Sequence, residues 1–306
     1  MSKKILITGA TGFIGSYLVK FFTKEGYKVV AHGSSEQSIK KLIKELENSA
    51  SSLENMDFWS QDFLEPNWEF PNFSEIEYII HTAAITKIRE GVLENYDKYF
   101  GLNVIATKKL AEKAIKENVK HFVYFSSGQV FGIPPNFPFV EETPKNPINL
   151  YGFSKYMGEL IIRSCGLFGL KFSIVRPFSV YGLGQQNIIS IIKDKIIKDE
   201  VLTIYGDGSQ SRAFTHINDI CEAILTVFNN PNCFGEEYNL SGDKEYSVNK
   251  LVELISQRLK KTPKIEKRTS DVKELQRNIA DTKKIKALGF NYKESLEDFI
   301  NYELID

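Results

Sequence analysis

Cysteine is scarce in this chain, with three residues among 306. Cys165, Cys221 and Cys233 form no Cys-x-x-Cys pair and have no accompanying histidine cluster. The sequence therefore predicts neither a disulfide framework nor a zinc site, and we expect three buried, reduced thiols and no bound metal.

Long apolar runs are also missing. The basic start is followed by Ile5 to Ile7 before Thr8 and Gly9, which is too short an apolar region for a signal peptide. No uncharged apolar stretch approaches the roughly 20 residues that span a membrane. We therefore expect a cytoplasmic protein without a membrane partner.

Neither sign of charge is in excess, because 39 basic residues balance 39 acidic residues. Such a chain has no overall field that attracts nucleic acid, so we expect no nucleic-acid partner. Any anionic ligand must be held by local groups. The hydrophobic fraction of 42% and the charged fraction of 25% are typical of a soluble globular protein.

Short apolar runs bounded by polar turns recur along the chain, and segments with helical periodicity, such as residues 14–24 and 102–114, separate most of them. Alternation of strands and helices implies right-handed crossovers and a parallel sheet covered on both faces. We predict a doubly wound α/β fold, whose ligands bind beyond the carboxyl ends of the strands. The predicted strands cover residues 5–8, 28–31, 56–59, 78–81, 121–126 and 172–176.

The pattern changes from about Tyr181 onward. A long helix rich in isoleucine and lysine, a short strand and a glycine turn at Gly206 and Gly208 follow one another there. We predict a first domain over residues 1–180 and a smaller C-terminal α/β substrate lobe over residues 181–306. Residues 213–235, which contain a helical segment, are expected to pack back on the first domain.

Three glycines, Gly9, Gly12 and Gly15, lie between the first predicted strand and the helix after it. In that context Gly9 allows a tight turn, Gly12 lets the backbone approach a pyrophosphate, and Gly15 lets helix and strand pack closely. The helix N-terminus then offers free N–H groups to the anion. A tight connection without a ligand is the alternative, but strand, spacing and helix agree on dinucleotide binding in a Rossmann-type domain.

Tyr151 and Lys155 stand four residues apart at the start of a predicted helix, after a strand that ends in Ser126 and Ser127. This spacing puts the phenol and the ammonium on one helix face. A tyrosine pKa of about 10 is too high for easy proton exchange at neutral pH unless a positive charge such as Lys155 stabilises the phenolate. Two solvated polar residues would show the same spacing, but the glycine turn and Ser127 favour a catalytic pair.

The motifs, taken in order, resemble the extended short-chain dehydrogenase/reductase family, which includes nucleotide-sugar epimerases and dehydratases. The resemblance covers nearly the whole chain and implies a Rossmann domain with a nicotinamide cofactor. It rests on the segments 9–15, 61–63, 81–84, 103–107, 126–132, 151–155, 176–182 and 206–212.

The resemblance gives Tyr151 the acid/base role in catalysis. It gives Lys155 two tasks, to lower the pKa of the phenol and to hold the nicotinamide ribose. Ser127 matches the residue that hydrogen-bonds the reacting oxygen, whereas Ser126 can point elsewhere because side chains alternate along a strand. Asn103 matches an asparagine that either orders helix and loop or relays protons.

The cofactor choice between NAD and NADP stays open. Relatives that use NAD carry an acidic residue where this chain has Gly33, and Ser34, Ser35 or Lys40 can donate to the 2′-phosphate of NADP. The resemblance places Asp62 near the adenine, although capping of the next turn would also explain it. The full expected cofactor-binding set is Gly9, Gly12, Phe13, Ile14, Gly15, Ser34, Asp62, Phe63, Ala83, Ala84, Thr86, Asn103, Ser126, Tyr151 and Lys155.

The resemblance also implies a nucleotide-diphosphate sugar as substrate. Arg212 matches an arginine that binds the diphosphate, and Arg268 resembles a second one, because the planar guanidinium pairs with phosphate oxygens. A surface salt bridge is the alternative for each. Ser179 replaces a frequent asparagine of the same subsite, and Ser127 contacts the sugar.

Dehydratases of the family carry an Asp-Glu pair where this chain has Gly128 and Gln129, so a 4,6-dehydratase is not expected. We therefore expect a nucleotide-sugar epimerase, acting most often at C4 in this family. An NADPH-dependent reductase of a 4-keto-6-deoxy sugar and a non-catalytic dinucleotide sensor are the alternatives. By analogy we expect a homodimer formed through residues 102–116 and 156–163.

Overall fold

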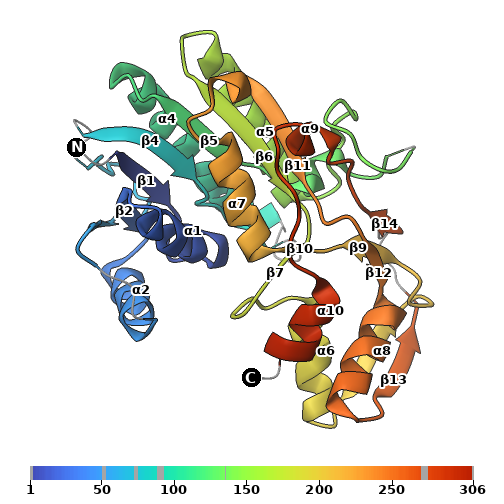
Figure 1. Cartoon of the computed structure of the whole chain (residues 1–306). Coiled ribbons are helices and arrows are strands. Elements are labelled where there is room, and N and C mark those ends of the chain that lie inside the picture. Colours follow the sequence, from blue (N-terminus) through green and yellow to red (C-terminus); the bar gives the residue numbers. More distant parts are fainter. Residues whose placement is uncertain are drawn as a thin grey trace. The chain divides into compact units, whose positions relative to one another are not determined.

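The computed structural model of the chain describes residues 3–49, 53–71, 75–87, 93–134, 136–269 and 275–304. Two units can be distinguished along it, and Figure 1 follows the chain through both. The first unit consists of Met1–Ile133, Thr143–Arg176 and Cys221–Tyr238, and the second of Pro134–Glu142, Pro177–Ile220 and Asn239–Asp306.

Seven strands form the main sheet, in the order β11-β6-β5-β4-β1-β2-β3. The strands β1 to β6 pair in parallel, and β5 is buried along its whole length. Burial on both faces is what a sheet between two helix layers requires. The bounds are β1 (Lys4–Thr8), β2 (Lys28–Gly33), β3 (Met56–Ser60), β4 (Ile76–His81), β5 (His121–Phe125), β6 (Phe172–Pro177) and β11 (Glu236–Leu240).

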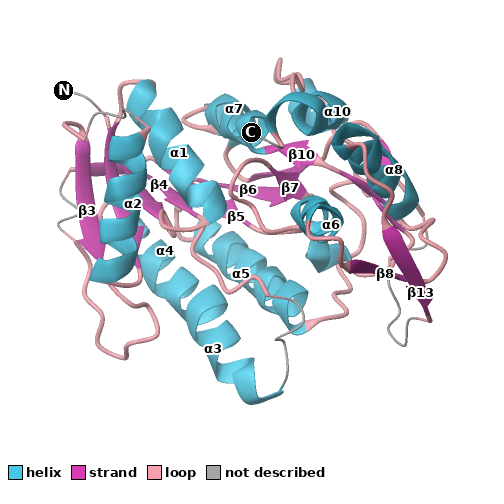
Figure 2. Cartoon of the chain, turned by 90° about the horizontal axis from the view of Figure 1, so that it is seen from below, coloured by secondary structure: helices cyan, strands magenta, loops and turns pink. Residues whose placement is uncertain are grey.

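Helices cover both faces of this sheet, which confirms the predicted doubly wound α/β fold. Figure 1 shows α1 (Phe13–Lys24) and α7 (Ile217–Val227) in front of the sheet, where Phe22 packs edge-on against Phe228. On the opposite face, α4 (Thr107–Lys116) and α5 (Leu150–Gly166) lie side by side in Figure 2. Their Leu110 and Ile162 share a buried cluster with Tyr124 of β5.

Two further features of the first unit bear on the site. Helix α2 (Glu36–Asn48) begins with a capping box, in which the Ser35 and Ser38 side chains each accept from the other residue's backbone N–H at 3.2 Å. The predicted helix over residues 102–114 is interrupted, because Gly101–Ala106 forms a π-helical turn between α3 (Tyr96–Phe100) and α4.

The second unit has its own apolar core, in which Ile192, Leu202, Leu251 and Phe299 are buried together. The sequence patterns did not predict its shortest strands, which have two or three residues. Its elements are β7 (Val180–Tyr181), α6 (Ile188–Ile197), β8 (Val201–Tyr205), β9 (Ser211–Ala213), β10 (Thr215–His216), β12 (Glu245–Ser247), α8 (Val248–Leu259), β13 (Lys264–Arg268), β14 (Arg277–Asn278), α9 (Lys283–Lys286), α10 (Leu296–Asp298) and a π-helical turn Phe299–Glu303.

All three cysteines are buried. Within the described ranges, no helix is both long and apolar enough to cross a membrane. The same residues contain no group of three or more histidine, cysteine, aspartate or glutamate side chains arranged to hold a metal ion.

Two buried histidines are expected to make the fold sensitive to acid. Burial lowers the pKa of His32 and of His121 to about 4, from 6.5. His32 Nδ1 lies 3.2 Å from the Gly9 backbone nitrogen, and His121 Nδ1 lies 3.2 Å from that of Asn229. Each N–H donates to a neutral ring nitrogen, so protonation of either ring removes its acceptor.

Because the pKa in the folded state lies below that in the unfolded chain, the stability contributed by each histidine is complete above about pH 6.5 and is lost as the pH falls towards 4. We expect each to lower the free energy of unfolding by about 2 kcal/mol between pH 7 and pH 5. Urea unfolding at both pH values measures the change. His121→Gln should flatten the dependence, and an unchanged slope would contradict the assignment.

Candidate active site

The turn between β1 and α1 offers backbone N–H groups to an anion. Gly9 has a φ of 69°, and a Cβ there would lie 2.7 Å from the Ala83 backbone. Gly15 is buried in α1, where a Cβ would clash with the Gly9 carbonyl oxygen. Gly12 caps α1 without a side-chain hydrogen bond, which leaves first-turn N–H groups for a ligand. This cradle fits the pyrophosphate of a dinucleotide.

His32, which no sequence pattern singled out, holds this turn in place. Its Nδ1 accepts from Gly9 N–H, and its Nε2 lies 2.9 Å from the Gln61 carbonyl oxygen. The ring stacks on Phe63 with 4.1 Å between centroids, and Trp59 and Trp68 complete an aromatic cluster around them. Phe63, an expected cofactor residue, is therefore buried with its ring against His32.

The residues expected at the adenosine end have defined local partners. Asp62 Oδ1 accepts from Leu64 N–H at 2.9 Å, which is the turn-capping contact. Ser35 caps α2, and Lys40 lies 3.9 Å from Glu36. Ser34 is exposed beside them. A carboxylate at the position of Gly33 would require rearrangement, because even a Cβ there would lie 2.6 Å from Thr11 Cγ2.

The segment after β4 is fixed by a chain of buried polar groups. Thr8 Oγ1 lies 2.6 Å from His81 Nδ1 and accepts from Ala83 N–H at 3.4 Å. Asn103, in the π-helical turn, accepts from Ile85 N–H at 2.9 Å and donates to the Ile85 carbonyl at 3.1 Å. The ordering role of this asparagine is thus visible in its contacts. Ala83 is buried, Ala84 half-buried and Thr86 exposed along this segment.

Asn103 also reaches the helix that carries the predicted catalytic pair. Its Nδ2 donates to Ser154 Oγ at 2.8 Å, and that hydroxyl donates to the Tyr151 carbonyl at 2.8 Å. The π-helical turn therefore ties the start of α5 to the loop after β4. Phe13 and Ile14, the remaining expected cofactor residues of the glycine turn, are the half-buried first residues of α1.

Ser127 and Tyr151 are brought together although 24 positions separate them in the sequence numbering. The Ser127 hydroxyl donates a hydrogen bond to the phenol oxygen, which favours the phenolate. Burial nevertheless raises the pKa of Tyr151 above its ordinary value of 10. The pKa of the Tyr151 phenol is therefore raised overall, whereas the sequence led us to expect that Lys155 lowers it.

Lys155 lies one turn further along α5 and is fully buried. Its Nζ stands 4.3 Å from the centroid of the Tyr124 ring. Burial lowers the pKa of this ammonium to about 7, and the Glu159 carboxylate opposes that effect. A lysine with such a pKa changes its charge near neutral pH, which is unusual and typical of functional sites.

The expected substrate residues other than Ser127 belong to the second unit. Ser179 adopts a positive φ of 37° between β6 and β7. Arg212 lies on β9, in register with Tyr246 on one side and Asn278 on the other. Arg268 ends β13, is exposed, and its Nη2 lies 2.9 Å from the Glu266 carboxylate. That contact is the surface ion pair named as its alternative.

Comparison with known proteins identifies the family. Residues 5–241 match the family model described as the NAD dependent epimerase/dehydratase family. The chain belongs to this family. Its relatives include the UDP-glucose 4-epimerase of Caenorhabditis elegans, which is 30% identical over 291 residues and 82% of each chain.

Solved structures of epimerases in this family have the same fold as the chain. The UDP-glucuronic acid 4-epimerase of Bacillus cereus, in complex with UDP-glucuronic acid and NAD, has a TM-score of 0.86 and 26% identity over 98% of both chains. The UDP-glucose 4-epimerase of Thermotoga maritima, with UDP-glucose, has a TM-score of 0.84 and 26% identity over 98% of this chain and 97% of that one.

Gln129, at the position where the resemblance places a dehydratase acid, contributes to the architecture of this family member. Its Oε1 accepts from Asn149 Nδ2 at 3.0 Å, and Asn149 Oδ1 accepts from Gly152 N–H at 2.8 Å as the N-cap of α5. The amide therefore orients the residue that starts the helix of Tyr151. An asparagine just before the periodic segment is the sequence signal that could have identified this cap.

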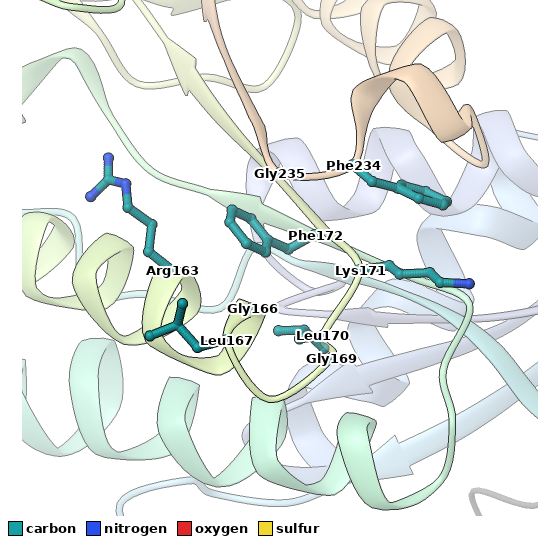
Figure 3. Close-up of a pocket in the computed structure, with 9 residues that line it drawn as sticks. All are labelled: Arg163, Gly166, Leu167, Gly169, Leu170, Lys171, Phe172, Phe234 and Gly235. Carbon is teal, nitrogen blue, oxygen red and sulfur yellow. The ribbon is translucent and has the colours of Figure 1, made fainter.

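A pocket of about 420 Å³ lies at the other end of α5 and β6 (Figure 3). It contains none of the expected site residues, because Tyr151 lies at the start of α5 and this pocket at its end. Arg163 on its wall is paired with Glu159 and Glu237. Its lining consists of Arg163, Gly166, Leu167, Gly169, Leu170, Lys171, Phe172, Phe234 and Gly235.

Proposed function

We propose that the chain is a nucleotide-sugar epimerase that inverts C4 of a UDP-linked hexose with NAD as cofactor. The observation that carries the proposal is the hydrogen bond between Ser127 and Tyr151, with Lys155 one turn along the same helix. The glycine cradle in the same unit fits a dinucleotide. The activities in the names of the related epimerases support C4 and UDP.

The mechanism assigns a task to each of these residues. When bound, the nicotinamide supplies reversible two-electron oxidation of the sugar carbon. Tyr151, as phenolate, takes the proton of the C4 hydroxyl during oxidation and returns it when the opposite face of the ketone is reduced. Ser127 hydrogen-bonds the same oxygen, and the Lys155 ammonium holds the ribose and favours the phenolate. No proton is gained or lost over the cycle.

We infer that NAD, rather than NADP, is the cofactor. The B. cereus epimerase is named as a complex with NAD. In this chain Ser35 is engaged as a helix cap, and Lys40 lies beside Glu36. Two of the three candidate donors to a 2′-phosphate thus already have partners within α2, which favours NAD. Ser34 is left to hydrogen-bond the ribose.

We also infer that the second unit supplies the substrate lobe and that Arg212, with Ser179 and more weakly Arg268, binds the diphosphate. Arg212→Ala is expected to weaken UDP-glucose binding about 10- to 100-fold, because it removes charge-assisted hydrogen bonds worth roughly 1.5–3 kcal/mol. Isothermal titration calorimetry on the NAD-loaded enzyme measures the loss. Arg277→Ala, on neighbouring β14, is the matched control and should bind within twofold of the parent.

Unchanged binding by Arg212→Ala would remove the arginine from the substrate site. The arginine would then have a structural role, since it already lies between two strands of the small sheet.

A reductase of a 4-keto-6-deoxy sugar is the second candidate, favoured by the absence of an acidic side chain at Gly33. The two functions differ in stoichiometry. The epimerase should co-purify with NAD, identified by mass spectrometry, and convert UDP-glucose to its C4 epimer without added cofactor. Consumption of one NADPH per product would support the reductase. A dinucleotide sensor would convert no nucleotide sugar by either route.

We further infer a cytoplasmic homodimer assembled through residues 102–116 and 156–163. Ile105 and Leu160 in these segments are apolar and about half exposed. Burial against a second copy would remove this surface from water. Light scattering gives the mass in solution, and a monomer at micromolar concentration would contradict the inference.

A further inference from the structure

A fully buried carboxylate lies one turn beyond Lys155 on α5. Glu159 Oε1 accepts from Arg176 Nε at 2.7 Å, and Oε2 accepts from Arg176 Nη2 at 2.8 Å. Arg163 Nη2 also donates to Oε2 at 2.8 Å. The fourth donor is Ser126, whose Oγ lies 2.5 Å from Oε1. Ion pairs and hydrogen bonds therefore satisfy both oxygens of this buried group.

The spacing connects the carboxylate to the catalytic residues. Tyr151, Lys155 and Glu159 follow one another at intervals of four, so they share one face of α5. Ser126 directly precedes Ser127, the partner of the Tyr151 phenol. One carboxylate therefore binds the residue that follows β5 and shares a face of α5 with Lys155.

We propose that Glu159 is a positioning residue, which fixes the segment of Ser126 and Ser127 against α5 and places a negative charge on the face of that helix that carries Lys155. The role in turnover rests on the proposed epimerase function. The charge on Lys155 and the contact with Ser126 are properties of the protein itself.

The surroundings of Lys155 show why a fixed anion is needed. The Tyr124 ring of β5 faces the ammonium, and burial raises the pKa of its hydroxyl. His81 of β4 is neutral, because burial and the Lys155 charge hold its pKa well below 6.5. Burial raises the pKa of Tyr151, on the same helix, above 10, so its phenol is neutral at pH 7 as well. Burial favours the neutral amine of Lys155. Among the described groups, the Glu159 carboxylate is the one that favours the charged ammonium.

Glu159 belongs to a cluster of charged side chains, and an amide at its position could not balance the positive charges there. Glu159 and Glu237 face two guanidiniums, Arg163 and Arg176, and Lys145 lies 3.9 Å from Glu237. Removal of the Glu159 charge increases the excess of positive charge in this cluster. Both the lost attraction and the new repulsion then favour the neutral amine.

Glu159→Gln tests the proposal by lysine NMR, which needs no substrate. Proteins labelled with ¹³C at lysine Cε are titrated with pH, and Lys155→Gln assigns the signal. In the parent the midpoint is expected near 7, and in Glu159→Gln on the order of one unit lower. Glu237→Gln is the matched control, because it removes a carboxylate from the same cluster. It should move the Lys155 midpoint by no more than roughly 0.3 unit, the effect of a more distant charge.

A variant with the opposite expected effect on the Lys155 midpoint keeps the test informative if Glu159→Gln does not fold. Arg163→Gln changes a partly exposed side chain and removes a cation that balances Glu159. It should raise the Lys155 midpoint. An unmoved or lowered midpoint in Arg163→Gln, or an unmoved one in Glu159→Gln, would overturn the proposal.

The pH profile of turnover adds the functional readout. In Glu159→Gln the basic limb should move down with the NMR midpoint, so that activity lost at pH 8 partly returns at pH 6. Ser126→Ala keeps the charge and should lower turnover at every pH without moving that limb. If the parent turns over no nucleotide sugar, the proposed function fails, whereas the NMR result still decides the role of Glu159.

Discussion

Replacement of Tyr151 by phenylalanine is expected to lower the turnover of UDP-glucose by about 10³-fold and to leave both the fold and the affinity for NAD intact. The substitution removes one hydroxyl, whose partner is Ser127, and keeps the ring that packs at the start of α5. General acid/base catalysis contributes typically 10² to 10⁴-fold, and positioning by the remaining groups is retained.

Tyr156→Phe is the matched control, because it removes the same hydroxyl from the same helix five positions later. Its turnover should stay within a factor of two or so of the parent. Rates are measured from the appearance of the C4 epimer, with NAD affinity from calorimetry and the melting temperature as folding controls. Equal rates for Tyr151→Phe and the parent would exclude Tyr151 as the acid/base group.

Replacement of Gly9 by alanine is expected to abolish NAD binding and to lower the free energy of unfolding by about 3 kcal/mol or more. Two effects add. An L-residue at a φ of 69° is strained, and its Cβ would stand 2.7 Å from backbone atoms of Ala83. The segment of Ala83 or the glycine turn must then move, and the cradle for the pyrophosphate opens.

Gly26→Ala separates these two effects. Gly26 has a φ of 84°, but a Cβ there would meet nothing within 4 Å. The strain alone costs about 1 kcal/mol, with NAD affinity unchanged. Urea unfolding and calorimetry on both variants measure the difference. If Gly9→Ala lost no more stability and no more NAD affinity than Gly26→Ala, the close approach to Ala83 would not be the reason that position 9 requires a glycine.

The sequence predicted those parts of the fold and site that depend on local patterns. The strands β1 to β6 are short runs bounded by polar turns, and a glycine turn between a strand and a helix has a fixed geometry. The fold predicts that a strand end and the helix start after it lie at one sheet edge, and Ser127 and Tyr151 are in contact there.

Contacts made between distant segments could not be predicted in this way. The hydrogen bonds of Asn103 to Ile85 and Ser154 depend on how a π-helical turn packs, and no periodicity signals such a turn. The short strands β9, β12 and β14 have too few residues to show alternation. The raised pKa of Tyr151 and the lowered pKa of Lys155 arise from burial, which spacing along a helix does not reveal.

The aromatic cluster around His32 gives the protein an optical signal of its own. Trp59 and Trp68 are the two tryptophans of the chain, and both lie in this cluster. His32 connects it to the Gly9 backbone. The emission excited at the red edge of the tryptophan band therefore originates in the cluster that contacts the turn proposed to hold the dinucleotide. We expect occupancy of that turn to change this emission, so that binding can be followed in the unlabelled wild-type protein without a coupled assay.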